Sequence, residues 1–147
     1  MTMSPFMQVA YSEAQASFNE GGLPVGSVLV HDGEIVSTGR NRQEQTGSNL
    51  LHAENDALER AGRRERRFFR ACELYTTLSP CPMCSGSVVF YEIPRIIVGD
   101  CTTFAGEVEW IRSRGVTVDL EESQECIALL QRFIREKPDL WRKIVAD

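Results

Sequence analysis

The second half of the chain alternates short apolar segments with segments of helical periodicity, and this alternation restricts the fold more than any other feature. Residues 72–77, 94–99 and 116–120 are short and mostly apolar, as expected of strands in a sheet interior. Residues 82–91 and 122–136 have the spacing of helices, and we expect another helix between the second and third strands. Strands separated by helices pair in parallel and carry helices on both faces. We therefore predict an α/β fold, a three-layer α/β/α sandwich.

The first half predicts a helix followed by a hairpin. Ser4-Pro5 is typical of a helix start, apolar residues then recur at helical spacing, and Gly21-Gly22 ends the helix. Residues 25–31 and 34–39 flank Asp32-Gly33, a dipeptide favoured in tight hairpin turns. Two antiparallel strands are therefore expected before the alternating half of the chain.

Composition indicates one domain that spans residues 1–147. A hydrophobic content of 42% in 147 residues supports a real core but leaves little room for a second one. The sequence contains no run of 18 apolar residues and no secretory signal at its start. We therefore expect a cytoplasmic protein with no membrane partner.

An arginine-rich run at 60–70 follows a polar stretch at 40–49 and a helix expected at about 52–62. Contact with RNA is one interpretation of this run, but the net charge of −5 argues against a broad polyanion-binding surface. We interpret the run as a solvated helix end and loop, and its Phe68 and Phe69 as core or dimer-interface residues. Nucleic acid is not an expected partner.

Two segments carry residues that bind metal, an H-x-E motif at 52–54 and a P-C-x-x-C motif at 80–84. Each is expected at a helix start, where free backbone N–H groups and the helix dipole favour thiolates and carboxylates. Zinc accepts imidazole nitrogen and thiolate sulfur, so His52, Cys81 and Cys84 predict one Zn²⁺ per chain. Three protein ligands leave a fourth position for water, as in catalytic zinc sites.

Glu54 lies two residues from His52 and is predicted to be the catalytic residue that moves protons without ligating the metal. Two alternatives remain: a redox dithiol at the C-x-x-C motif, or a structural zinc site completed by a further cysteine that leaves Glu54 idle. The other cysteines lie among apolar neighbours and are expected to be core thiols. These are Cys72, Cys101 and Cys126. His31, beside the hairpin turn, is expected to be solvated.

The two motifs together form the pattern of zinc nucleobase deaminases. With them, the sequence resembles the cytidine deaminase-like superfamily, most closely its fungal-type free-base cytosine deaminases. Residues 74–84 (LYTTLSPCPMC) are similar to the zinc segment of these enzymes, and residues 93–99 (IPRIIVG) to the strand that follows it. Residues 133–141 (FIREKPDLW) are similar to their terminal helix and lid, and the likeness extends from about Gly21 to Trp141.

The resemblance implies a central five-stranded mixed sheet, a homodimer, and a lid formed by residues 138–147. It also implies that water hydrolyses a small heterocyclic substrate with release of ammonia. By position, the implied substrate contacts are the Asn41 side chain, the Ala53 N–H, the Ser79 carbonyl, the Phe104 and Trp141 rings, and the apolar side chains of Leu23 or Val25.

Two positions depart from the cytosine deaminase pattern. Ala53 replaces a glycine, which is mild because the contact there is made by backbone. Ile144 replaces an aspartate that accepts the pyrimidine N1–H, and losing a buried acceptor costs on the order of 1–3 kcal/mol. Asp147 is a possible substitute acceptor. An apolar residue at 144 also fits a ring with an N-methyl group, such as creatinine.

The sequence leaves two other functions open. His-Ala-Glu at residues 52–54 is also found in tRNA adenosine and guanine deaminases, which are competing enzyme interpretations. A zinc-stabilised binding module without catalysis is an interpretation of a different class. Metal removal distinguishes this module, because a structural zinc site unfolds when its metal is chelated.

Overall fold

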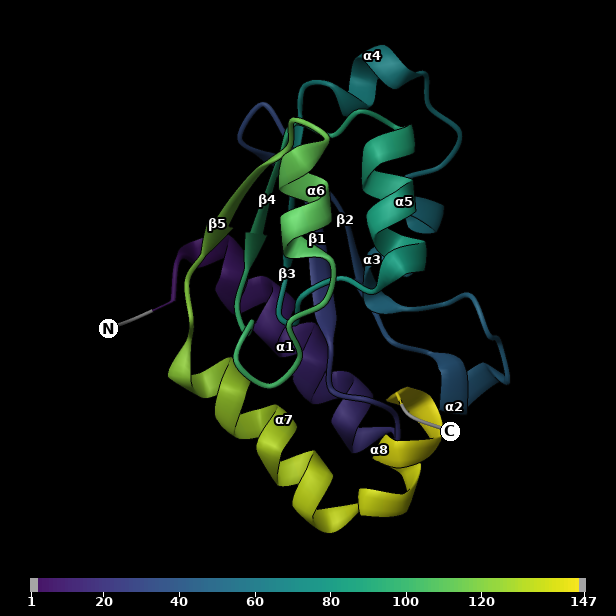
Figure 1. Cartoon of the computed structure of the whole chain (residues 1–147). Coiled ribbons are helices and arrows are strands. Elements are labelled where there is room, and N and C mark those ends of the chain that lie inside the picture. Colours follow the sequence, from purple (N-terminus) through teal and green to yellow (C-terminus); the bar gives the residue numbers. More distant parts are fainter. Residues whose placement is uncertain (1–2, 146–147) are drawn as a thin grey trace.

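One mixed sheet forms the centre of the molecule in the computed structural model, which describes residues 3–145. Its strands are β1 (Gly26–His31), β2 (Glu34–Arg40), β3 (Cys72–Thr76), β4 (Arg95–Val98) and β5 (Thr117–Leu120). The helices are α1 (Pro5–Asn19), α2 (Gln43–Thr46), α3 (Ala53–Arg60), α4 (Arg66–Phe69), α5 (Pro82–Phe90), α6 (Val108–Ser113), α7 (Gln124–Glu136) and α8 (Pro138–Val145). The strand order is β2-β1-β3-β4-β5 (Figure 1).

Strand direction follows from the connections between strands. β1 and β2 are antiparallel and joined through Asp32 and Gly33, which both adopt positive φ (49° and 80°) as a tight hairpin turn requires. β1 is also antiparallel to β3, whereas β3, β4 and β5 are parallel and connected through α5 and α6. The predicted five-stranded mixed sheet is confirmed.

Helices cover both faces of the sheet, so the predicted three layers are present (Figure 1). On one face, Met7 of α1 and Cys126 of α7 pack against Val28 of β1. On the other face, Val88 of α5 and Ile111 of α6 lie in one cluster with the inner residues of β3 and β4. Successive strand side chains point to opposite faces, which lets the central strands contribute to both clusters.

The polar segments differ from expectation. Residues 40–49, predicted only as a polar stretch, contain the short helix α2, and the arginine-rich run contains α4. The Ser4 hydroxyl does not cap α1 but donates to Glu121 Oε2 at 2.5 Å. Within residues 3–145, no helix is both long and apolar enough to cross a membrane.

Two of the three expected core thiols are buried. Cys72 and Cys126 lie inside the hydrophobic clusters, but Cys101 is only partly buried, because it lies in the loop that follows β4. His31 is not a simple solvated turn residue. Its ring stacks on Phe68 with a centroid distance of 4.2 Å, and it is half-buried as a result.

The contact of α3 with β2 depends on Gly39. A Cβ atom at this position would lie 2.4 Å from both the Ala53 carbonyl oxygen and the Ala57 backbone nitrogen. We expect Gly39→Ala to lower the free energy of unfolding by about 1–3 kcal/mol, because backbone atoms must move apart. Gly86→Ala on α5 is the control: its Cβ meets nothing within 4 Å, so the substitution should be neutral or stabilising. Urea unfolding of both variants checks this, and equal effects would contradict the prediction.

Candidate active site

The predicted metal ligands come together at the N-termini of α3 and α5. His52 is the N-cap residue of α3, Cys81 is the N-cap residue of α5, and Cys84 lies in the first turn of α5. The ligand atoms of these three residues all lie within 4.8 Å of one another, and Cys81 Sγ is 3.4 Å from His52 Nδ1. The Cys84 backbone N–H donates to Cys81 Sγ at 3.5 Å. His52 is thus brought next to two cysteines that lie 29 or more positions further along the chain.

The chemistry of these donors fits zinc. Two sulfurs and one imidazole nitrogen form a ligand set that tetrahedral zinc accepts, with one position left over. A hydrogen bond from the Cys84 thiol lowers the pKa of Cys81 to about 4, and the same bond raises the pKa of Cys84. The hydrogen bond to Cys81 also raises the pKa of His52. The two cysteines therefore share a proton that a divalent cation can displace.

Glu54 lies in the first turn of α3, next to these ligands, and its side chain is only 5% exposed. Burial raises the pKa of its carboxyl from 4.5 to about 7, and the negative charge of Cys81 adds to the shift. A carboxyl group with a pKa near neutrality can both accept and release a proton at physiological pH.

A cavity of about 240 Å³ adjoins the ligands, and Glu54 lines it. Three residues predicted to make polar substrate contacts line the same cavity: Asn41, Ala53 and Ser79. The amide orientation of Asn41 is set by its neighbour Gln43, whose backbone N–H donates to Asn41 Oδ1 at 3.0 Å. Among the described lining residues, Glu54 carries the only carboxylate.

The apolar part of the lining contains the other predicted contact residues. Leu23 and Val25 precede β1, Phe104 lies in the loop after β4, and Trp141 and Ile144 lie on α8. All five belong to one hydrophobic cluster that also includes Phe133 of α7, so α8 packs onto the body of the protein beside the cavity. Asp147, the possible substitute acceptor, lies outside the described residues.

A model of the cytidine and deoxycytidylate deaminase zinc-binding region matches residues 1–100. The chain belongs to this deaminase family. The family binds zinc, His52, Cys81 and Cys84 form a group that could hold one metal ion, and the chain is a hydrolase of the deaminase type.

Relatives of this deaminase differ in their substrates. The chain is 39% identical to a cytosine deaminase of Candida albicans, over 96% of this chain and 95% of the relative. It is 36% identical to a tRNA-specific adenosine deaminase of Streptococcus pyogenes, over 89% of this chain and 82% of the relative. A solved guanine deaminase from Nitrosomonas europaea shares the fold, with a TM-score of 0.68 and 21% identity over 90% of this chain and 86% of that chain.

Three further residues line the deaminase cavity and were missed in the sequence. Leu78 and Pro82 lie within the zinc segment itself, so their positions beside Ser79 and Cys81 were the signal that could have identified them. Val145 follows Ile144 on α8, and no motif in the sequence marks it as a cavity residue. Cys84 does not line the cavity, because it is fully buried behind it.

The burial of Glu54 should make the free energy of unfolding depend on pH in the deaminase without zinc. Folding raises the pKa of this carboxyl from 4.5 to about 7, so the folded state binds its proton more tightly than the unfolded state. The free energy of unfolding should therefore fall as the pH rises from about 4.5 to 7 and remain low above that range. Glu54→Gln cannot ionise, so it should be more stable than wild type by about 1–3 kcal/mol at pH 8, with less difference at pH 5.

Urea unfolding of the chelated proteins at both pH values measures this effect. Glu59→Gln is the matched control, because Glu59 lies on the same helix but is exposed. If Glu54→Gln raised the free energy of unfolding equally at pH 5 and pH 8, the raised pKa of Glu54 would be contradicted.

Proposed function

We propose that this deaminase hydrolyses a small cyclic amidine, cytosine or a cytosine-like ring such as creatinine, and releases ammonia. The observation that carries the proposal is the cavity beside the predicted zinc ligands: it measures about 240 Å³, is largely apolar, and is lined by the Glu54 carboxylate. Sites for drug-sized ligands measure roughly 300–1,000 Å³, so this volume suits a single small heterocycle. The similarity to the Candida albicans cytosine deaminase over nearly the whole chain supports the same substrate class.

In the proposed reaction, water adds to the amidine carbon, the bond from that carbon to the exocyclic nitrogen breaks, and ammonia leaves as a carbonyl forms. Zinc, when bound, lowers the pKa of the attacking water. Glu54 carries one proton of that water to the ring nitrogen of the amidine. It then carries the second proton, from the hydroxyl that becomes the carbonyl, to the departing amino nitrogen, a double task that suits its pKa of about 7.

The remaining cavity residues bind and orient the ring in this proposal. The Asn41 amide and the Ala53 backbone N–H bind the ring carbonyl, and the Ser79 carbonyl accepts a hydrogen bond from the amino group. The rings of Phe104 and Trp141 cover the heterocycle, with α8 acting as the lid. When the substrate ring is held next to the attacking water, it loses the freedom to reorient, and the activation barrier of the reaction falls.

Adenosine in tRNA or free guanine is the competing substrate. The His-Ala-Glu motif and the 36% identity to a tRNA-specific adenosine deaminase support it. Two features favour the small free ring: side chains of α8 line the cavity, and the net charge of −5 disfavours a polyanionic partner. We further propose, from the resemblance, that the chain is a single-domain cytoplasmic protein and acts as a homodimer.

The direct test is an ammonia-release screen over cytosine, 5-fluorocytosine, isocytosine, creatinine, guanine and adenine, in wild type and Glu54→Gln. We expect turnover of a single-ring substrate, loss of turnover by at least about 10³-fold in Glu54→Gln, and unchanged zinc content. Glu59→Gln is again the control and should keep full activity. Preference for adenine or guanine, or activity retained in Glu54→Gln, would refute the proposal.

Ile144 is expected to set the choice between ring types. An aspartate at this position would supply an acceptor for the pyrimidine N1–H, whereas isoleucine accommodates an N-methyl group. Ile144→Asp should therefore shift the ratio of kcat/KM for cytosine over creatinine upward by about 10-fold or more. Lys143→Asp, an exposed neighbour on α8, should leave the ratio unchanged. A wild type that already strongly prefers cytosine would disprove this role of Ile144.

A further inference from the structure

The two halves of the candidate site come from separate elements. Asn41 follows the last residue of β2, whereas His52 and Glu54 lie at the start of α3. Ten residues, 42–51, join the two, and only four of them are helical, in α2. The position of Asn41 relative to Glu54 therefore depends on the Arg42 N–H bond to the Leu51 carbonyl at 2.9 Å, which joins the two ends of this loop, and on contacts that cross between β2 and α3.

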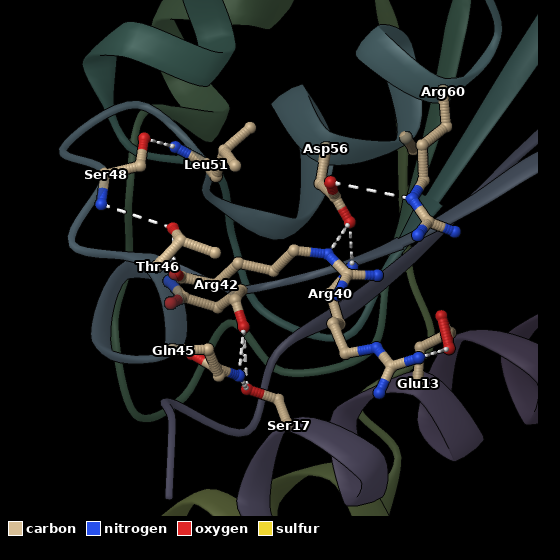
Figure 2. Close-up of polar contacts among 12 residues, drawn as sticks. Glu13, Ser17, Arg40, Arg42, Gln45, Thr46, Ser48, Leu51, Asp56 and Arg60 are labelled. Carbon is tan, nitrogen blue, oxygen red and sulfur yellow. Dashed lines mark hydrogen bonds and ion pairs between the residues drawn. The ribbon is translucent and has the colours of Figure 1, made fainter. Parts of the chain in front are cut away.

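One carboxylate makes the most direct of these contacts (Figure 2). Asp56 Oδ2 accepts the backbone N–H of Arg40 at 3.0 Å and the Nε–H of Arg42 at 2.9 Å. Arg40 and Arg42 are the residues immediately before and after Asn41. The Asp56 carboxylate on α3 therefore binds the chain on both sides of Asn41. Asp56 is 3% exposed and the Arg42 side chain 18%, so solvent screens this pair weakly.

Contacts from α1 secure the same segment from the other side. The Asn41 carbonyl accepts hydrogen bonds from Ser17 Oγ of α1 at 2.8 Å and from Gln45 Nε2 of α2 at 2.9 Å. Arg40 directs its guanidinium to Glu13 of α1 and to Glu20, the C-cap residue of that helix, at 3.4 and 2.8 Å. These bonds tie Asn41 to α1, but α1 carries none of the zinc ligands or Glu54. Within residues 3–145, the Asp56 carboxylate is the side chain that bonds both neighbours of Asn41 from the helix of Glu54.

Close packing makes this connection rigid. Gly39 leaves room for no side chain between β2 and the backbone of α3, and Ser37 Oγ donates to the Ala57 carbonyl at 2.6 Å. Because β2 is packed tightly against α3, a displacement of Arg42 would move the loop and Asn41 rather than the strand or the helix.

We propose that Asp56 and Arg42 are positioning residues, which hold the Asn41 amide at the correct distance from Glu54 for the ring carbonyl to bind. The inference rests on the proposed function, because it assumes that Asn41 contacts the substrate. A contact made equally to substrate and transition state contributes to KM and leaves kcat almost unchanged. Loss of the pair should therefore weaken substrate binding more than turnover.

Arg42→Gln tests the pair by removing the guanidinium. We expect KM for the substrate found in the screen to rise about 10-fold, with kcat per bound zinc changed by less than about 3-fold. The matched control is Arg95→Gln, which removes an arginine paired with Glu73 and Asp119 far along the sheet. It should leave KM unchanged.

A double variant separates positioning from stability, because Arg42→Gln removes the closer of the two arginines that pair with the buried Asp56 carboxylate and leaves it with Arg60, at 3.8 Å. Arg42→Met with Asp56→Asn removes both charges and keeps an acceptor for the Arg40 N–H, so the unfolding midpoint should recover toward wild type. KM should stay raised, because the side chain at position 42 is still not held by residue 56. Recovery of KM together with stability would overturn the inference.

A readout independent of turnover is the side-chain amide of Asn41. The chain has four asparagines, so an NMR spectrum of protein labelled with ¹⁵N-asparagine contains few side-chain amide signals. The signals that disappear in Asn41→Ala are those of Asn41. In Arg42→Gln the Asn41 amide signals should shift or broaden, whereas those of Asn55, held by Ser87 at 2.9 Å, should not. Unchanged Asn41 signals and unchanged KM in an active enzyme would overturn the inference alone. Inactivity of the wild type on every substrate would overturn the proposed function and the inference with it.

Discussion

The meeting of two helix N-termini at one end of the sheet is the constraint on which the site depends. α5 begins just beyond β3, and α3 lies against β1 and β2, so Cys81, Cys84 and His52 converge although the chain separates them. At a helix N-terminus the free N–H groups and the dipole stabilise negative charge, which suits a thiolate awaiting a cation. The absence of a side chain at Gly39 lets α3 approach the sheet closely enough for this arrangement to form.

Burial gives the same region its chemistry. Glu54 lies in the first turn of α3, where its low exposure moves the pKa of the carboxyl to about 7 and prepares it to carry protons in both directions. Asp56, two residues further along α3, is also buried, but it is paired with Arg42, Arg60 and a backbone N–H. Two acidic residues on one helix turn thus have different roles: one is left free beside the cavity, and the other connects the helix to the strand that precedes Asn41.

Local patterns predicted the features that depend on neighbouring residues. The hairpin follows from Asp32-Gly33, and the ligand set follows from the spacing of two short motifs. The short helix α2 was missed because four residues show no periodicity, and part of its start comes from the Gln43 N–H bonding to the Asn41 side chain. Pairings across the fold, such as Arg42 with Asp56 or Ser4 with Glu121, leave no trace in local sequence. For the same reason His31 was expected to be solvated, although Phe68 covers it.

The proposed chemistry depends most directly on a zinc ion held by two sulfurs and one imidazole nitrogen, with its fourth position open to water. Zinc-edge X-ray absorption on the purified wild-type protein measures this coordination. The prediction is one zinc per chain, with two Zn–S distances near 2.3 Å and two nitrogen or oxygen distances near 2.0–2.1 Å, one of them from an exchangeable light ligand. Three sulfur ligands would contradict the account, because a further cysteine would then close the site as a structural centre and leave no place for the attacking water.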